Sequence, residues 1–439
     1  MLLSLPMPEE NLFYHPEAAP PNALVPQFGS QGEKREYLDH LFGGHEPVEG
    51  AGKLIMPGMA SGCAVDVTTK EYVAEMARLG IMGTWAGSAP GWRILLEDLF
   101  HEPPARRKEL FSESNGRAVE EAAAFFHERC EHSIRGVNSM QILGDFDHTV
   151  DCIIQSGSFD FLAAGAGLAK NFPERFAQPD AAHMYYIPIV STATTVKLFE
   201  RFIAKKEGNR RPGAYYFEWE SAGGHLGPYE PDKSIEQVIA EIRKLAPTTP
   251  IILAGGIGYR DQIRMAQEVA NGWAFATRGI LSQPHSGLPR DVVENVYLNS
   301  ALGIGVDKRS PTGFPSRRVL TPIPEYTPAM IQEAVDNCVG CLRTGKCKFL
   351  QGAARRKAGE QVDAGPDEIP YCIARELARM RAGIMRVPGV YDGLYFTGDQ
   401  LRDFRRDTEL HGEEGQRTVP TQEQAVWYML THDSRKPTA

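Results

Sequence analysis

Short apolar runs alternate with amphipathic stretches from position 53 to about position 302, which is the pattern of strands that are each followed by a helix. In the stretch 69–79, for example, Tyr72, Val73 and Met76 recur at helical spacing, and Gly80 is a typical helix stop. The pattern predicts strands over 54–56, 81–85, 137–142, 159–163, 184–190, 214–217, 251–254 and 273–276. It predicts helices over 69–79, 118–130, 148–155, 194–206, 234–245, 260–270 and 292–301.

Eight strand–helix units in about 250 residues are typical of the parallel (β/α)8, or TIM, barrel. The alternative is a doubly wound open sheet, which would open on a G-x-G-x-x-G turn after its first strand. The segment 57–62 reads Pro-Gly-Met-Ala-Ser-Gly and lacks that spacing, whereas glycine-rich turns follow the last strands. We therefore expect an α/β protein with a (β/α)8 barrel.

The barrel pattern leaves residues at both ends of the chain. Residues 1–50 carry many Pro, Gly and Glu and show no clear period, so we expect an N-terminal extension that packs on the barrel or frays. The barrel then spans 51–302, with an irregular insert before position 118. Residues 303–439 form a C-terminal subdomain or cap that we expect to be mainly helical, with a turn-rich connector at 310–315, helices over 330–337 and 369–382, and a polar tail.

Composition narrows the class of protein. The chain has 439 residues, 42% of them hydrophobic, and a net charge of −9. The hydrophobic content suffices for a large core, and the acidic balance argues against a nucleic-acid partner. No apolar run approaches the ~20 residues that cross a bilayer, and the first residues lack the order of a secretion signal. We expect a cytoplasmic enzyme with no membrane partner.

The segment 220–227, Glu-Ser-Ala-Gly-Gly-His-Leu-Gly, follows the sixth predicted strand directly. In a barrel this is the catalytic end, and two glycines allow close approach of the backbone to a flat ligand. An imidazole there, that of His225, suits proton transfer near neutral pH. The competing interpretation is an ordinary turn with a hydrogen-bonded histidine.

Two further turns, 254–258 (Ala-Gly-Gly-Ile-Gly) and 275–279 (Phe-Ala-Thr-Arg-Gly), follow the seventh and eighth strands. Backbone N–H groups of a Gly-Gly turn and of a helix start, with one threonine hydroxyl, make an anion site. Turns on adjacent strands predict one shared phosphate, unless both are plain barrel turns.

These motifs resemble the nitronate monooxygenases (2-nitropropane dioxygenases), FMN-dependent TIM barrels related to the bacterial flavin enoyl-ACP reductases. The resemblance spans roughly 53–405 and rests on short motifs. They are Ala222-Gly223-Gly224-His225, Ala254-Gly255-Gly256-Ile257, Thr277, Val137-Asn138, Ser310-Pro311-Thr312-Gly313-Phe314-Pro315, Tyr371-Cys372-Ile373-Ala374 and Gly393-Leu394-Tyr395-Phe396-Thr397-Gly398.

The resemblance implies FMN as cofactor, with His225 as the catalytic base at the reactive edge of the flavin. The implied flavin-ring contacts are Gly58, Met59 and Ala60, and Asn138 would bond the ring or ribityl region. The implied phosphate and ribityl contacts are Gly223, Gly224, Gly255, Gly256, Ala276 and Thr277.

Three positions depart from the family. Glu218 stands at a flavin contact where many members have Gln, so its contact must differ or be made by the protonated acid. Ala276 stands where several members have Gly. The segment 190–192 reads Val-Ser-Thr where some relatives place a Lys near the flavin.

The implied reaction is oxidation of an alkyl nitronate with O2 to a carbonyl compound and nitrite. The alternative is an NAD(P)H-dependent flavin reductase of enoyl thioester or quinone substrates, because fold does not fix function. A non-catalytic FMN-binding barrel within a larger assembly is a third hypothesis. The partners expected are a small-molecule substrate and O2, with a homodimer as one option.

Seven cysteines, an odd number, fit reduced thiols. Cys338, Cys341, Cys347 and Cys372 include one C-x-x-C pair, a spacing that suits zinc or an iron–sulfur cluster, but the second pair lacks it. We therefore expect reduced structural thiols and no metal, with a metal, a cluster or a redox role as alternatives.

Overall fold

A computed structural model describes residues 23–43, 54–62, 67–91, 102–323, 326–358, 371–382 and 390–434. Its centre is a closed barrel of eight parallel strands in the order β1-β2-β3-β4-β5-β6-β8-β9. The barrel strands are β1 (Met59–Ala60), β2 (Met82–Ala86), β3 (Arg135–Met140), β4 (Phe161–Gly165), β5 (Tyr185–Val190), β6 (Tyr215–Glu218), β8 (Ile251–Ala254) and β9 (Gly272–Phe275). The predicted (β/α)8 barrel is therefore confirmed.

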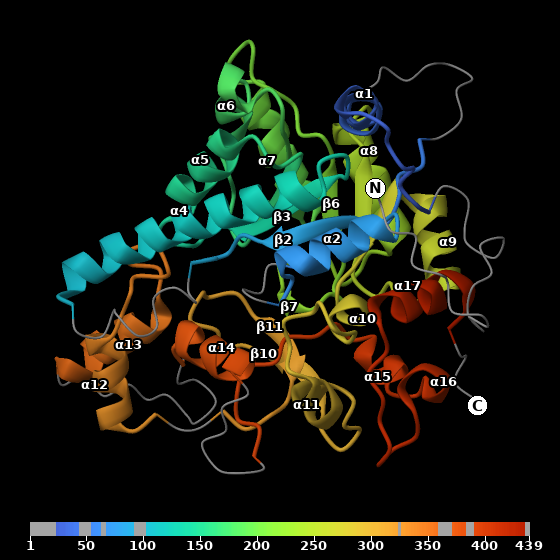
Figure 1. Cartoon of the computed structure of the whole chain (residues 1–439). Helices are drawn as coiled ribbons and strands as arrows, with labels where there is room; N and C mark the ends of the chain where they lie inside the picture. Colours follow the sequence, from blue (N-terminus) through green and yellow to red (C-terminus); the bar gives the residue numbers. More distant parts are fainter. Residues whose placement is uncertain are drawn as a thin grey trace.

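Helices cover the outside of the barrel, as Figure 1 shows. They are α2 (Lys70–Arg78), α4 (Pro104–Arg129), α5 (Phe146–Ser156), α7 (Ala193–Ile203), α8 (Ile235–Leu245), α9 (Arg260–Val269) and the short α10 (Thr277–Ile280). Two short helices, α6 (Phe172–Arg175) and η3 (Pro179–Ala181), lie between β4 and β5. The amphipathic pattern explains this layer, since each long helix buries one apolar stripe against the strands.

The first strand lies further along the chain than predicted. β1 begins at Met59, which pairs with Met82 of β2 and with Ala274 of β9. The apolar run 54–56 precedes the barrel because the amide of Met56 bonds the carbonyl of Asn271 in the loop before β9. The prediction rested on apolar character alone and therefore put the strand a few residues too early in the chain.

Helix α4 is longer than predicted, because it begins at Pro104 rather than near position 118. Serine, asparagine and glycine at 112–116 are weak helix formers and hid the helical pattern. Tertiary contacts hold that part in the helix, since Phe111 is buried and Asn115 accepts the Gly91 N–H at 2.7 Å. What looked like an irregular insert is in part the first turns of this helix.

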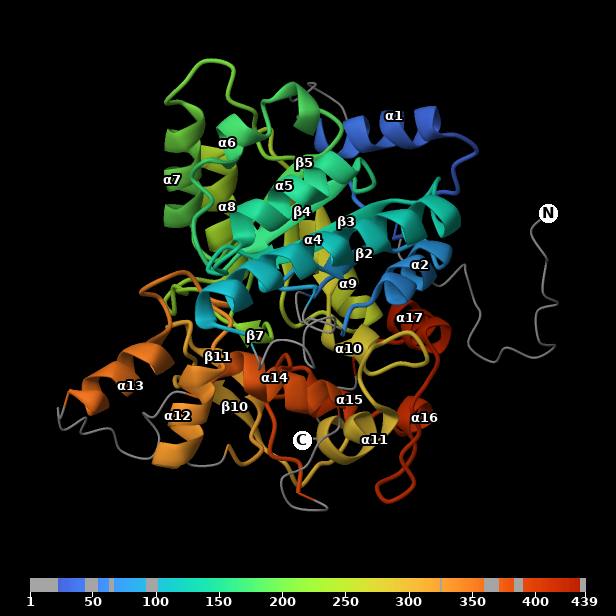
Figure 2. The same cartoon turned by 60° about the vertical axis from the view of Figure 1, so that its left-hand side comes forward.

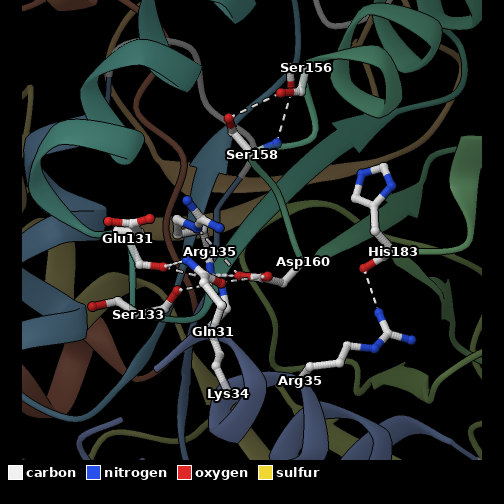
Figure 3. Close-up of polar contacts among 10 residues, drawn as sticks. All are labelled: Gln31, Lys34, Arg35, Glu131, Ser133, Arg135, Ser156, Ser158, Asp160 and His183. Atoms are coloured by element: carbon white, nitrogen blue, oxygen red, sulfur yellow. Dashed lines mark hydrogen bonds and ion pairs between the residues drawn. The ribbon is translucent and has the colours of Figure 1, made fainter. Parts of the chain in front are cut away.

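Helix α1 (Gln31–Phe42) closes the end of the barrel where the strands begin. The Lys34 ammonium is buried and lies 3.0 Å from Asp160, the residue before β4 (Figure 3). The same carboxylate accepts the Arg135 backbone N–H at 2.8 Å, and Arg35 donates to the carbonyl of His183 at 2.8 Å. The described part of the predicted N-terminal extension therefore packs on the barrel; residues 1–22 and 44–50 lie outside the described residues.

The C-terminal part is mainly helical, as expected, and it also contains a small sheet that the sequence did not predict. Strand β10 (Ile304–Asp307) pairs with β11 (Ser316–Val319), and β11 pairs with β7 (Gly224–His225) from the loop after β6. The predicted connector 310–315 is the turn between β10 and β11. The helical stretch predicted at 292–301 is α11 (Arg290–Val292) and the π-helical turn η4 (Val293–Tyr297).

The described residues of the C-terminal part also form the helices α12 (Pro328–Asp336), α13 (Lys348–Lys357), α14 (Ile373–Ala382), α15 (Leu401–Phe404), α16 (Thr408–His411) and α17 (Gln422–Thr431). Figures 1 and 2 show α12–α16 together on the side of the barrel where β7 lies, opposite α1. The expected polar tail was wrong, because α17 buries Val426, Met429 and Leu430 in the main core. Within the described residues no helix combines the length and apolarity needed to cross a membrane.

Candidate active site

A cavity of ≈ 250 Å³ lies at the ends of the barrel strands, between the barrel and the C-terminal part. This size is slightly below the ~300–1,000 Å³ typical of small-molecule sites. The turns after β6, β8 and β9 supply one wall, and Leu377, Met380 and Phe396 supply part of the other. In TIM-barrel enzymes the active site lies at the carboxyl ends of the barrel strands.

His225 lies on the cavity wall in β7, and a C-terminal sheet positions it. Its Nε2 is 2.9 Å from Oγ of Ser310, which in turn is 2.8 Å from Oγ1 of Thr312. The imidazole also packs on Phe396, with ring centroids 5.2 Å apart. The histidine is therefore fixed in position by residues far along the chain, which a free turn would not achieve.

Gly223 permits this arrangement by its lack of a side chain. A Cβ at Gly223 would lie 2.4 Å from the carbonyl carbon of Thr397 and 2.5 Å from the nitrogen of Gly398. Arg317 of β11 donates to the carbonyl of Ala222 at 2.7 Å and also bonds the carbonyl of Glu220. The turn after β6 is thus held between the barrel and the C-terminal part.

Burial lowers the pKa of His225 to about 4. The side chain has some exposed surface, but that surface faces the cavity and protein atoms surround it, so the charged form is disfavoured. At neutral pH the imidazole is therefore uncharged, with one N–H donor and one acceptor nitrogen.

Glu218, the last residue of β6, also lines the cavity. Burial raises the pKa of Glu218 to about 8. The side chain is therefore mostly protonated at pH 7 and can donate a hydrogen bond, as the amide of a glutamine does.

The turns after β8 and β9 meet at one corner of the cavity. Gly256 has φ +78°, and a Cβ there would lie 2.7 Å from Oγ of Ser221 and 3.8 Å from Nε2 of Gln400. Oγ1 of Thr277 accepts the Gly398 N–H at 2.9 Å, so the hydroxyl hydrogen of Thr277 remains to be donated. Gly255 and Ala276 line the same corner. These groups could hold an oxyanion.

The structure places the other predicted cofactor residues as follows. Asn138 lines the cavity and donates from Nδ2 to Oγ of Ser61 at 3.0 Å, and Gly224 lines it beside His225. Gly58, Met59 and Ala60 are not among the described residues of the cavity wall. A Cβ at Gly58 would overlap the ring of Trp273, and Met59 packs inside the barrel. At the end of β1 the wall is made by Ser61 and Gly62 instead.

Two cavity residues that the sequence did not single out have strained backbones. Ala89 (φ +58°) and Ala166 (φ +50°) are the non-glycine residues with positive φ in the described part of the chain, and both line the cavity. Such strain costs of order 1–2 kcal/mol and concentrates at functional sites. No sequence signal marks them, because alanine is unremarkable in a turn.

Comparisons with known proteins agree with the fold. A scan against protein-family models and a search of curated proteins found no match. Among solved structures, a FabK mutant from Thermotoga maritima is similar with a TM-score of 0.53 and 15% identity, covering 90% of this chain and 94% of that one. A nitroalkane oxidase from Streptomyces ansochromogenes has a TM-score of 0.47 and 15% identity, covering 79% and 96%. At this identity the likeness to FabK shows that the two chains share the barrel fold.

Proposed function

We propose that this protein is an FMN-dependent oxidoreductase that oxidises an alkyl nitronate with O2. The observation that carries the proposal is the convergence of an oxyanion corner, a protonated Glu218 and an uncharged His225 on one largely apolar cavity. A flavin needs these three surroundings: an anchor for its phosphate, hydrogen bonds to its ring, and a dry space beside its reactive edge.

The residues present fit FMN. Oγ of Ser88 and Oε1 of Gln400 are buried, lack a hydrogen-bond partner in the described structure, and belong to residues that line the cavity. Buried polar atoms are nearly always satisfied, so these two favour a polar ligand. Gly256, Thr277 and Gln400 would hold the phosphate, and Asn138 and Glu218 would face the ring system. When bound, FMN supplies the transfer of electrons from substrate to O2.

The protonation state of His225 favours a nitronate over a neutral nitroalkane. A base with a pKa of about 4 is a weak acceptor for the α-proton of a nitroalkane. A nitronate has already lost that proton and carries negative charge, to which a neutral imidazole can donate one hydrogen bond. In this proposal His225 orients the anionic substrate, and its role as base is secondary.

One observation favours the alternative, an NAD(P)H-dependent reductase of an enoyl thioester or quinone. The cavity wall extends over apolar side chains of the C-terminal part, among them Leu342, Ile373 and Leu377. An extended apolar wall suits an acyl chain or an isoprenoid tail better than a small nitronate.

The test uses the purified full-length protein. Its absorbance and the identity of the released flavin show whether it binds FMN, and anaerobic mixing with propyl nitronate, NADH or NADPH shows which donor reduces the flavin. We expect FMN to be present and propyl nitronate to bleach it. Bleaching by NAD(P)H and not by the nitronate supports the reductase instead. A protein that cannot be loaded with FMN contradicts both.

A further inference from the structure

Four cysteines from three segments of the C-terminal part gather beside the cavity. Cys338 and Cys341 follow α12, Cys347 precedes α13 directly, and Cys372 precedes α14. Three of them, Cys341, Cys347 and Cys372, pack against the same apolar cluster. Cys347 and Cys341 lie 25 and 31 residues before Cys372 in the chain. It is therefore the fold, and not the local sequence, that brings the three cysteines together.

The four thiols are close enough to influence one another. Burial first, and then the charges of Cys372, Cys347 and Cys338, raise the pKa of Cys341 well above its usual range. Burial raises the pKa of Cys372 to about 12, and Cys347 and Cys338 add to that rise. Burial also raises the pKa of Cys347, with a further contribution from Cys338. Every pair among the four therefore interacts, as expected of one compact group.

Backbone amides point at three of the four sulfur atoms. The Gly340 N–H lies 3.4 Å from Sγ of Cys338. The N–H groups of Phe349 and Leu350, in the first turn of α13, lie close enough to Cys347 to oppose the rise of its pKa, and that of Arg375, in the first turn of α14, does the same for Cys372. Amides and helix N-termini stabilise a thiolate, and such N–H···S bonds surround protein-bound iron–sulfur clusters. These contacts oppose the effect of burial and would stabilise the sulfur atoms as thiolate ligands when iron is bound.

Barrel contacts hold the segment that carries Cys341 in place. Leu342 forms a β-bridge with Leu143, the Gly144 N–H bonds the carbonyl of Cys341 at 3.1 Å, and the Arg343 N–H bonds that of Ile142 at 2.9 Å. The site is therefore anchored to the barrel through the loop after β3, and it does not depend on α12 and α13 alone.

Neither disulfide bonds nor a single bound metal ion accounts for these four cysteines. The described cysteines are all free, so no disulfide explains the group. Within the described residues no three His, Cys, Asp or Glu side chains are placed to hold a single metal ion, so the described structure shows no preformed tetrahedral zinc site. A cubane cluster holds its cysteines further apart than one ion does, since the iron and sulfide atoms lie between them.

We propose that Cys338, Cys341, Cys347 and Cys372 ligate a [4Fe–4S] cluster. Cys341, Ile373 and Ala374 line the cavity, so the cluster lies at its wall. There it ties α13, α14 and the segment after α12 to the barrel. Ligation of iron removes the proton from each thiol, so cluster assembly is expected to release protons.

The test measures iron rather than turnover. The full-length protein is purified without oxygen and reconstituted with ferrous iron and sulfide; iron, acid-labile sulfide and the electron paramagnetic resonance of the dithionite-reduced protein are then measured. We expect about four iron and four sulfide per chain and a cluster signal. Cys341→Ser and Cys372→Ser should each lose more than half of this iron, whereas Cys152→Ser, which alters a free thiol on α5, should keep it.

Less than one iron per wild-type chain after reconstitution, or equal loss in the Cys152→Ser control, would overturn the proposal. So would one zinc per chain, bound in place of iron when both are offered. The wild-type stoichiometry decides the question even if a serine variant fails to fold. The FMN content, measured on the same samples, keeps the outcome separate from that of the proposed function.

Discussion

Nε2 of His225 and Oγ of Ser310 lie 2.9 Å apart although 85 positions separate them in the chain. The contact fixes the imidazole toward the cavity, because Ser310 is itself fully buried and bonded to Thr312. If His225 orients the substrate, loss of this hydrogen bond should slow turnover without expelling the flavin.

Ser310→Ala is therefore expected to lower kcat by about 5- to 30-fold, which corresponds to ~1–2 kcal/mol of lost positioning, while FMN content stays unchanged. Steady-state kinetics with propyl nitronate and flavin absorbance measure the two effects. Ser434→Ala, at a half-buried serine that is the last described residue and bonds Asp261, serves as control. Unchanged kcat in Ser310→Ala would show that the contact has no role in turnover.

Glu218 makes the stability depend on pH in a specific direction. Burial raises its pKa from 4.5 to about 8, so the folded state holds a proton that the unfolded state has lost between these values. Its contribution to the free energy of unfolding is thus complete below about pH 4.5 and is lost as the pH rises through about 8.

Glu218→Gln removes this dependence, so the variant should gain Tm relative to wild type between pH 5 and pH 9, by about 2–4 °C for each kcal/mol. Thermal unfolding at both pH values measures the gain. Glu241→Gln, which alters a surface partner of Lys233, should show none. His225 is present in all three proteins, so its contribution to the pH dependence of Tm cancels when a variant is compared with wild type. A Tm difference that is constant between the two pH values contradicts the protonated state of Glu218.

Substitution of Gly256 tests whether the oxyanion corner binds FMN, with substitution of Gly157 as the control. Gly256 (φ +78°) and Gly157 (φ +64°) both have left-handed backbones, but only a Cβ at Gly256 meets a cavity residue, Ser221, at 2.7 Å. Each Gly→Ala change should destabilise the fold by roughly 1–2 kcal/mol. Only Gly256→Ala should also weaken FMN binding, by tenfold or more, as measured by titration of the flavin-free protein. Equal FMN affinities in the two variants would remove Gly256 from the site.

A buried ion pair joins α10, which follows β9, to the C-terminal part. Arg278 of α10 lies 2.6 Å from Asp407, and both side chains are inaccessible to solvent. Asp407→Asn leaves the guanidinium without its counter-charge and should cost ~3–5 kcal/mol in chemical denaturation. Asp433→Asn breaks the exposed pair with Arg260 and should cost at most ~1 kcal/mol. Similar losses in the two variants would mean that the buried pair is not structurally important.

The local pattern determined the barrel and singled out several residues that line the cavity. The periods of apolar residues and the glycine-rich turns after the last strands depend only on neighbours in the chain, so eight strand–helix units, His225, Gly256 and Thr277 followed from sequence. The same reasoning misplaced the first strand, because an apolar run does not reveal that its amides bond a loop rather than a neighbouring strand.

Only the tertiary structure decided what surrounds these residues. Ser310 beside His225, Gly398 on Thr277 and Gln400 beside Gly256 are contacts between segments that are 85 to 144 positions apart, and no periodicity encodes them. The protonation states of Glu218 and His225 also depend on the tertiary structure, because the fold buries both side chains and burial shifts their pKa values. The fold likewise brings together four cysteines, of which only Cys338 and Cys341 form a local C-x-x-C pair in the sequence.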